Sequence, residues 1–206
     1  MPRQVDHPKR RADIVDAVWR LIVRHGLEAV TMRHVAAEAG VSLGQVQHYF
    51  ASKDELLMLA LERVSEQLGA RIGPRIAESA ESEPRSLVRA VLVEMLPLDE
   101  QRRTEAHVAF AYLARAAVVP ALAKVLRAGY DQFRDFLIEQ IEVGQRVGQV
   151  AADRDARREA VALLAMLDGL TAHALVEHHS PAEARLALEL HLDDLFGARG
   201  DRAGGA

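Results

Sequence analysis

The fold is decided by residues 31–50, which read TMRHVAAEAGVSLGQVQHYF. Thr31 and Ser42 each stand where a helix N-cap is expected, and Gly40 between them permits a sharp turn. The stretch predicts a short helix over 32–39 and a second from Ser42 to about Phe50. Apolar side chains at helical spacing can form one small shared core: Val35, Ala36, Ala39, Val41, Val46 and Phe50. This is the helix-turn-helix pattern, whose second helix enters the major groove of DNA.

The outward face of the second helix carries side chains suited to base edges. The outward residues are Leu43, Gly44, Gln45, Gln47 and His48. Gln45 and Gln47 carry the paired donor and acceptor suited to adenine, and Leu43 can touch a thymine methyl group. Lys53, at the start of the next helix, is placed to meet a phosphate. The alternative is an ordinary helical hairpin whose polar side chains face water.

Outside this stretch the pattern stays helical, and nothing alternates with period two for long enough to predict a strand. We expect one helix over 8–25 and a long helix that begins at Ser52. Pro84 suits the first position of a helix that continues over 87–96, and further helices are expected over 99–117, 120–147, 155–178 and 181–195. Three capping boxes begin at Ser42, Ser52 and Ser180. The sequence therefore predicts an all-α fold of about nine helices, with a three-helix head and a larger helical body.

Composition excludes several classes of protein. The chain has 206 residues, enough for one domain or two small ones, and no cysteine, which excludes disulfides, thiolate zinc sites and cysteine nucleophiles. Its longest apolar run, Ala160 to Leu167, is too short to span a bilayer, and no secretory signal is evident, so we expect a cytoplasmic protein without membrane contact. Residues 1–53 hold eight Lys/Arg against five acids, whereas the remainder holds 18 against 25, which favours a polyanion as the partner of the head.

Residues 31–44, together with the continuation YFASKDELL over 49–57, resemble the TetR family of bacterial repressors. The resemblance covers roughly residues 10–60. It implies a dimeric repressor bound to double-stranded operator DNA, with a head over 1–53, an effector-binding and dimerisation domain over 54–197, and a disordered tail over 198–206. The positions that match the family's DNA-contacting residues are Thr31, Arg33, Ser42, Gln45, Gln47, His48, Tyr49 and Lys53. Gln47 replaces the tyrosine that most members direct at a phosphate, so its contact is to a base or to phosphate; this departure resembles the BetI-like branch.

The last two predicted helices are candidates for the homodimer interface. The helix over 155–178 is apolar almost all round, and such a helix must be buried on both sides. Core on one side and a partner chain on the other satisfy that requirement, with the last helix completing a four-helix contact across a two-fold axis. The alternative is a fully internal helix in a monomer.

A small-molecule effector site in the body requires an apolar cavity with a few convergent polar groups. The candidates are Met95, His107, Phe110, Phe133, Phe136, Met166, Asp168 and His173. Methionine and phenylalanine at helical spacing are also typical of core, and Asp168 can cross-link helices or pair at the interface. A helix-turn-helix regulator without a small-molecule ligand, controlled by a protein partner or by its own abundance, is the alternative function.

The histidines near residue 178 were candidates for a metal site. His173 and Glu177 are four residues apart and share a helix face, but no further ligand is evident, and His178 and His179 are expected to point in different directions. A solvated helix end is therefore favoured, and we expect no metal and no cofactor. The sequence also lacks a phosphate loop and a nucleophile elbow, so we predict that the chain is not an enzyme.

Overall fold

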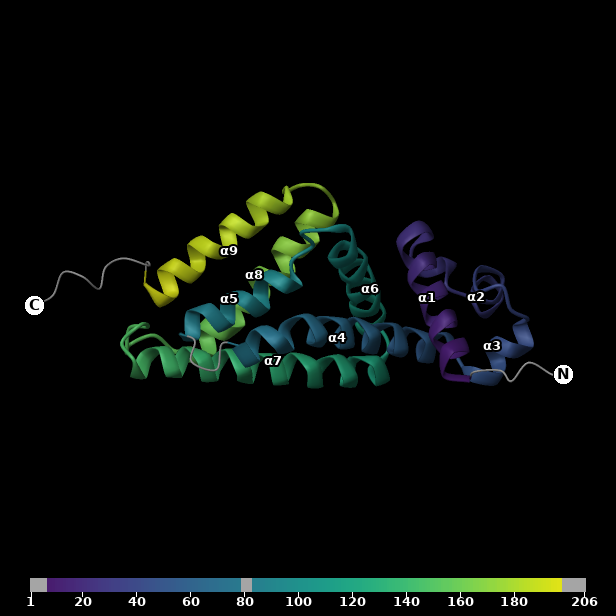
Figure 1. Ribbon diagram of the computed structural model, residues 1–206, viewed down its shortest axis with the longest axis horizontal. Coiled ribbons are helices and arrows are strands. Elements are labelled where there is room, and N and C mark those ends of the chain that lie inside the picture. Colours follow the sequence, from purple (N-terminus) through teal and green to yellow (C-terminus); the bar gives the residue numbers. More distant parts are fainter. Residues whose placement is uncertain (1–6, 79–82, 198–206) are drawn as a thin grey trace, which may run out of the picture. The chain divides into compact units, whose positions relative to one another are not determined.

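A computed structural model describes residues 7–78 and 83–197, and every regular element in them is a helix, as predicted (Figure 1). The elements are α1 (His7–His25), a short 3-10 turn η1 (Leu27–Ala29), α2 (Met32–Glu38), α3 (Leu43–Tyr49), α4 (Lys53–Glu78), α5 (Pro84–Met95), α6 (Glu100–Ala116), α7 (Pro120–Arg146), α8 (Ala156–Leu175) and α9 (Pro181–Phe196). Within the described ranges, no helix combines the length and the hydrophobicity needed to cross a membrane.

The chain divides into two compact units. Unit 1 comprises Met1–Gln67 and His107–Lys124, and unit 2 comprises Leu68–Ala106 and Val125–Ala206. Helices α4, α6 and α7 therefore contribute residues to both units. The functional boundary that we place at residue 53 stays a prediction, and the predicted tail over 198–206 lies outside the described residues.

The core of unit 1 is built on one face of α1. Ile14, Ala17 and Val18 are fully buried, as the helical spacing predicts, and Val35 of α2 and Val46 of α3 join them. On the same helix, the indole Nε1 of Trp19 donates to the carbonyl of Ala60 at 3.1 Å, which ties α1 to α4. The head is thus a three-helix arrangement supported by the first part of α4, and it holds α3 by its inner face.

Three local motifs set the helix boundaries of the head. The Thr31 hydroxyl accepts from the His34 amide at 3.1 Å, and Gly40 takes φ 65°, the left-handed conformation that glycine adopts without strain. Both bonds of the Ser42 capping box are present. The capping box predicted at Ser52 is only half present. Ser52 accepts from the Glu55 amide as predicted, but the Glu55 side chain accepts from the amide of Ala51, at 2.6 Å, and not from that of Ser52.

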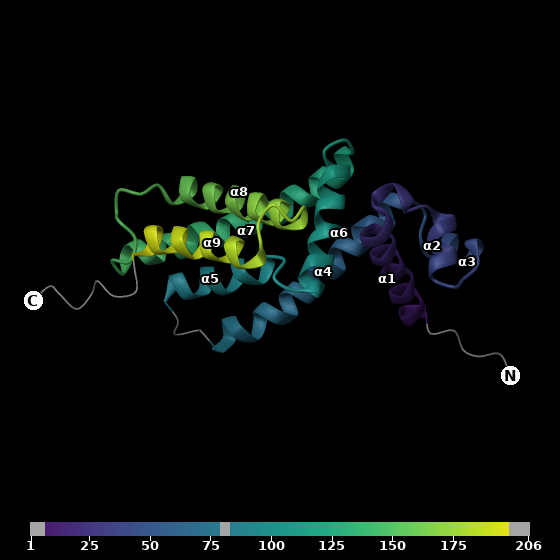
Figure 2. The ribbon, with the colours of Figure 1, turned by 90° about the horizontal axis from the view of Figure 1, so that it is seen from above.

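The core of unit 2 is formed by α5, α8, α9 and the part of α7 that belongs to this unit (Figure 2). Helix α9 packs beside both α5 and α8. Fully buried side chains include Leu92 on α5, Ile141 on α7, Leu163 on α8 and Leu188 on α9. The capping box at Ser180, with Pro181 as first helical residue, starts α9 as predicted.

Helix α8 is buried along one face and carries apolar side chains on the other. Leu163 and Leu167 are buried, whereas Val161 keeps 53% of its surface exposed. The helix ends at Leu175, three residues before the predicted His178. It ends there because Glu177 takes φ 60°, a left-handed conformation that reverses the chain.

Candidate nucleic-acid interface

The outer face of α3 is available to a ligand along its length. Gln45, Gln47 and His48 are exposed, and Leu43 is half-buried. The His48 and Tyr49 rings meet edge to face with centroids 5.2 Å apart, which packs Tyr49 against the end of the helix. Because Val46 and Phe50 are buried on the opposite side, the helix presents its polar row outward, as a recognition helix must.

Gln45 and Gln47 differ in what their carboxamides already do. The Oε1 atom of Gln45 accepts from the Ser42 amide at 3.0 Å and completes the capping box. In this conformation Gln45 cannot present a paired acceptor and donor to adenine without breaking the cap. The carboxamide of Gln47 makes no hydrogen bond with any described residue and is exposed. Gln47 is therefore the better candidate for a base contact.

Replacing Gln47 with alanine is expected to relax operator preference at one base pair by about 1–3 kcal/mol while leaving thermal stability unchanged. Gln45→Ala is the matched comparison, and we expect it to lower the melting temperature because it removes one of the two bonds of the capping box. Fluorescence anisotropy on single-base operator variants measures the first effect. If Gln47→Ala weakened binding equally on all sequences and reduced its salt dependence, the contact would be to phosphate.

The residues predicted to meet the DNA backbone differ in whether their side chains already have a partner. Arg33 is exposed on α2, and the Thr31 hydroxyl is engaged in its N-cap. The Lys53 Nζ donates to the carbonyl of Leu27 at 2.9 Å, so this ammonium group is anchored to η1. An ammonium group has three donors, so the anchored Lys53 retains donors for a phosphate oxygen.

Nearby arginines are already paired with an acid. Arg20 Nε lies 2.6 Å from Glu38 Oε1, and Arg24 Nη1 lies 3.6 Å from the same oxygen. The hydrogen bond from Arg20 holds the pKa of Glu38 below its ordinary value, so the carboxylate stays charged at neutral pH. These two arginines therefore offset the negative charge of Glu38, which would repel DNA. Their presence is not in itself evidence for phosphate contacts.

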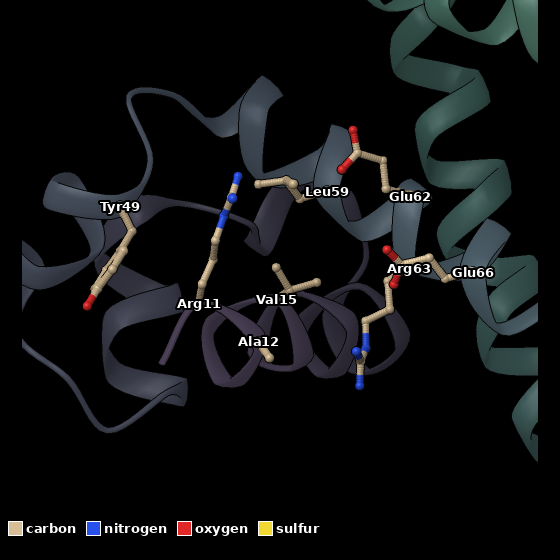
Figure 3. A pocket seen from close by; sticks show the side chains of 8 residues that line it. All are labelled: Arg11, Ala12, Val15, Tyr49, Leu59, Glu62, Arg63 and Glu66. Atoms are coloured by element: carbon tan, nitrogen blue, oxygen red, sulfur yellow. The ribbon is translucent and has the colours of Figure 1, made fainter. Parts of the chain in front are cut away.

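Arg11, which the sequence did not single out, places its guanidinium 5.8 Å from the centre of the Phe50 ring. Arg11 also borders an open cavity of about 560 Å³ in unit 1 (Figure 3). Its other lining residues are Ala12, Val15, Tyr49, Leu59, Glu62, Arg63 and Glu66. None of the eight effector candidates lines this cavity, and Arg63 within it is paired with Asp16 at 2.9 Å.

The effector candidates are divided between the two units. His107 and Phe110 belong to unit 1, and the other six belong to unit 2. All are half-buried except His173, which is exposed. In unit 2 the Phe133 and Phe136 rings stack with centroids 6.2 Å apart, and the Tyr130 hydroxyl donates to Asp168 Oδ2 at 3.1 Å. The structure thus brings together Tyr130 and Asp168. Asp168 was among the effector candidates from the sequence, and Tyr130 was not.

Burial dominates the electrostatics of the Tyr130–Asp168 pair. Desolvation raises the pKa of Asp168, and the hydrogen bond from Tyr130 partly opposes that shift. Burial, followed by the nearby Asp168 charge, raises the pKa of the Tyr130 phenol, so it remains a neutral donor at physiological pH. A carboxylate held in a partly apolar site is a group that a cationic ligand can stabilise.

A buried charge network in unit 2 was not foreseen. Arg71 of α4 donates to both oxygens of Glu105 at 2.8 and 2.6 Å, and through Nε to Glu94 at 3.1 Å. Glu94 and Glu105 are 3% and 5% exposed. The Glu94 carboxylate lies on an otherwise apolar face of α5, with Ala90 and Val91 one turn before it, and that placement is the signal that could have pointed to a buried partner. The network fixes the unit 2 part of α4 to α5 and α6.

The histidines near the end of α8 are also arranged differently from the prediction. Glu177 does not share a helix face with His173, because α8 has ended and the chain has reversed. The His178 and His179 rings do not diverge: their centroids are 4.6 Å apart, and both rings contact that of His173.

Comparison with protein-family models gives two matches. A model described as "Bacterial regulatory proteins, tetR family" matches residues 14–59, which contain α2 and α3. A second model, described as "BetI-type transcriptional repressor, C-terminal", matches residues 84–197. Together they span most of the part of the chain that the structure describes.

Individual proteins agree with these matches. The HTH-type transcriptional regulator PksA of Bacillus subtilis is 36% identical over 86% of this chain and 84% of its own. A transcriptional regulator from Rhodococcus sp. Rha1 has a crystal structure similar at a TM-score of 0.77, with 32% identity over 90% of this chain and 95% of its own. A regulator from Saccharomonospora viridis, crystallised in complex with choline, is similar at a TM-score of 0.75, with 28% identity over 91% and 95% of the two chains.

Proposed function

The chain belongs to the TetR family of DNA-binding transcriptional regulators, with a BetI-type C-terminal domain, and we propose that it is a dimeric repressor released from its operator by a small molecule. Members of this family are regulators and not enzymes. The observation that supports operator reading most strongly is the exposed polar row of α3, held in place by the Ser42 capping box and the buried Val46.

Dimerisation through α8 and α9 is supported by apolar side chains that unit 2 leaves in water. Val161 on α8 is 53% exposed, and Leu186 and Leu190 on α9 are 58% and 60% exposed. The two helices pack on each other, so their outer faces can form one continuous surface. A two-fold axis pairs such a surface with its own copy, which buries the apolar side chains and holds two heads for two half-sites.

The effector that we propose is a small organic cation. The Saccharomonospora relative was crystallised with choline, and this chain places the stacked Phe133 and Phe136 on the same helix as Tyr130, which bonds Asp168. Aromatic faces and a carboxylate are the groups that attract a quaternary ammonium ion. Isothermal titration with choline tests this assignment. Heat that saturates at one choline per chain is expected, and its absence up to millimolar choline would contradict the assignment.

Release requires that the effector bind two states of the protein unequally. A coupling of about 1–3 kcal/mol corresponds to a 5- to 150-fold change in operator affinity. Helix α4 is the segment that we propose to carry this coupling, because its first part supports the head in unit 1 and Arg71, farther along, is fixed in unit 2. A shift of α4 changes the separation of the two heads in the dimer.

Replacing Asp168 with asparagine is expected to raise stability and weaken choline binding at once. A carboxyl whose folded pKa is raised stabilises the fold where it is protonated, and that contribution is lost as pH rises through the folded value. Asparagine keeps an acceptor for Tyr130 without the burial penalty of a charge. We expect the melting temperature at pH 7 to rise by about 1–3 °C, with the difference shrinking as the pH falls toward 4.

The same variant is expected to bind choline about tenfold more weakly, because the attracting charge is gone. Asp153→Asn is the control, since Asp153 is exposed and makes no interaction with the described residues, and neither quantity should change. A lower melting temperature at pH 7 together with unchanged choline affinity in Asp168→Asn would contradict the proposed site.

A regulator without a small-molecule ligand is the second candidate function. The observation that favours it is the position of the cavity in unit 1, which none of the effector candidates lines. If neither choline nor a panel of related cations changes the melting temperature or the operator affinity, control by a protein partner or by abundance becomes the better account.

A further inference from the structure

Three histidines converge where α8 gives way to α9. Among the described residues, the one group of three side chains able to hold a metal ion is His173, His178 and His179, whose ligand nitrogens lie within 4.8 Å of one another. The ring centroids are 5.1, 5.0 and 4.6 Å apart. We propose that these residues bind one divalent transition-metal ion of the class that prefers imidazole, with Zn²⁺ as the reference ion.

The backbone brings the three rings together. Glu177 takes φ 60°, an unfavourable conformation for a residue with a Cβ atom. The reversal lets the amides of His178 and His179 both reach the carbonyl of His173, at 2.9 and 3.4 Å. His178 and His179 are thereby folded back over the last turn of α8, where His173 stands. Backbone strain that aligns side chains in this way is a reason to look for a ligand.

Arg103 of α6 also holds the reversed segment. Its guanidinium donates to the carbonyls of Ala174 and Leu175 at 3.1 and 3.0 Å, and to Glu177 Oε1 at 3.3 Å. These bonds satisfy the Ala174 and Leu175 carbonyls without using any imidazole ring. The end of α8 is therefore capped by Arg103. Capping does not explain why three imidazole rings converge there.

The distances suit a metal ion after small side-chain movements. Zinc binds imidazole nitrogen at about 2.0–2.1 Å, which places ligand nitrogens of a tetrahedral site roughly 3.3 Å apart. The nitrogens here are within 4.8 Å, and His173 and His178 are exposed, so rotation of their rings meets little resistance. Three histidines leave the fourth position of a tetrahedral ion to water or to another ligand.

The charges near the cluster are two carboxylates and one arginine. Glu177 and Glu183 are acidic, and hydrogen bonds from Ser180 hold the pKa of Glu183 below its ordinary value, so it remains a carboxylate near His178 and His179. Arg103 opposes a cation, but its guanidinium is paired with Glu177. A favourable interaction with the helix dipole accounts for one histidine at a helix end. It does not account for the convergence of three rings.

The test is zinc binding by the full chain without an affinity tag, measured by competition with a chromophoric chelator. One Zn²⁺ per chain is expected, and His173→Gln and His178→Gln should each weaken binding by at least about tenfold. His25→Gln is the control, because His25 is an exposed histidine in the last turn of α1. It should bind zinc like the unaltered chain.

Failure to bind zinc, unchanged affinity in either cluster variant, or an equal loss in His25→Gln would overturn the proposal. Circular dichroism melting without zinc checks that the variants are folded, and two independent variants guard against one that is not. The measurement needs neither DNA nor an organic effector, so its outcome is independent of the function proposed above. Bound zinc should also raise the melting temperature of the unaltered chain and not that of His173→Gln.

Discussion

Replacing Arg71 with methionine is expected to lower the free energy of unfolding by about 3–5 kcal/mol, because the buried Glu105 loses its arginine and Glu94 is left with the more distant Arg102, at 3.4 Å. Arg71 contacts both oxygens of Glu105 and one of Glu94, and the two acids are 5% and 3% exposed. Removing one partner of a buried ion pair leaves an uncompensated charge, which costs more than the pair itself contributes. Urea denaturation followed by circular dichroism measures the loss.

Two further variants test whether the buried charges are the cause. Arg71→Met combined with Glu94→Gln and Glu105→Gln should recover most of the lost stability, because neither position then carries a buried negative charge. Arg134→Met is the matched control: its partners Asp131 and Asp135 are exposed, at 57% and 68%, and we expect a loss below about 1 kcal/mol. A loss of similar size in Arg71→Met and Arg134→Met would contradict the role given to the network.

Replacing Leu190 with glutamate is expected to convert the dimer to a monomer and to reduce operator affinity by about 100-fold or more. Leu190 is 60% exposed in the single chain, so the substitution does not disturb the core of unit 2. In the proposed interface the charge is buried against apolar side chains of the partner. When two heads are linked in a dimer, binding of the first half-site holds the second head near the other half-site. A monomer lacks this gain in operator affinity.

Sedimentation velocity gives the oligomeric state, and fluorescence anisotropy gives the operator affinity of the same sample. Val147→Glu is the control, since Val147 is 57% exposed and lies beyond the end of α7, outside the proposed interface. It should remain a dimer and bind the operator normally. A dimeric Leu190→Glu chain would show that the contact between copies lies elsewhere.

The fold could be predicted closely because its determinants are local. Thr31, Ser42 and Ser180 cap helices where the sequence places caps, and helical spacing identified the buried faces of α1 and α3. A cap depends on residues three positions apart, so it can be found without knowledge of tertiary structure. The exception is Glu55, whose side chain bonds the amide of Ala51 one residue before the predicted partner.

The features that escaped prediction depend on contacts between distant residues or on an unusual backbone angle. Arg71 is separated by 34 residues from Glu105, and nothing local announces that a glutamate on α6 is buried. The histidine cluster requires the left-handed Glu177, a conformation that sequence patterns favour at glycine or asparagine. For the DNA-contacting face, the sequence identified which residues are exposed on α3, but the capping bond of Gln45 emerged from the structure.

If two copies of this chain read a specific DNA sequence, repeated selection from a random duplex library will enrich one motif with two inverted half-sites. We expect the half-sites to lie about one helical turn apart, or a multiple of it, and to be bound by two chains or a multiple of two. Anisotropy on the enriched duplex should then resist competition by excess random DNA. A library that yields no motif, with binding that vanishes as salt rises and ignores sequence, would show that the chain does not read a specific operator.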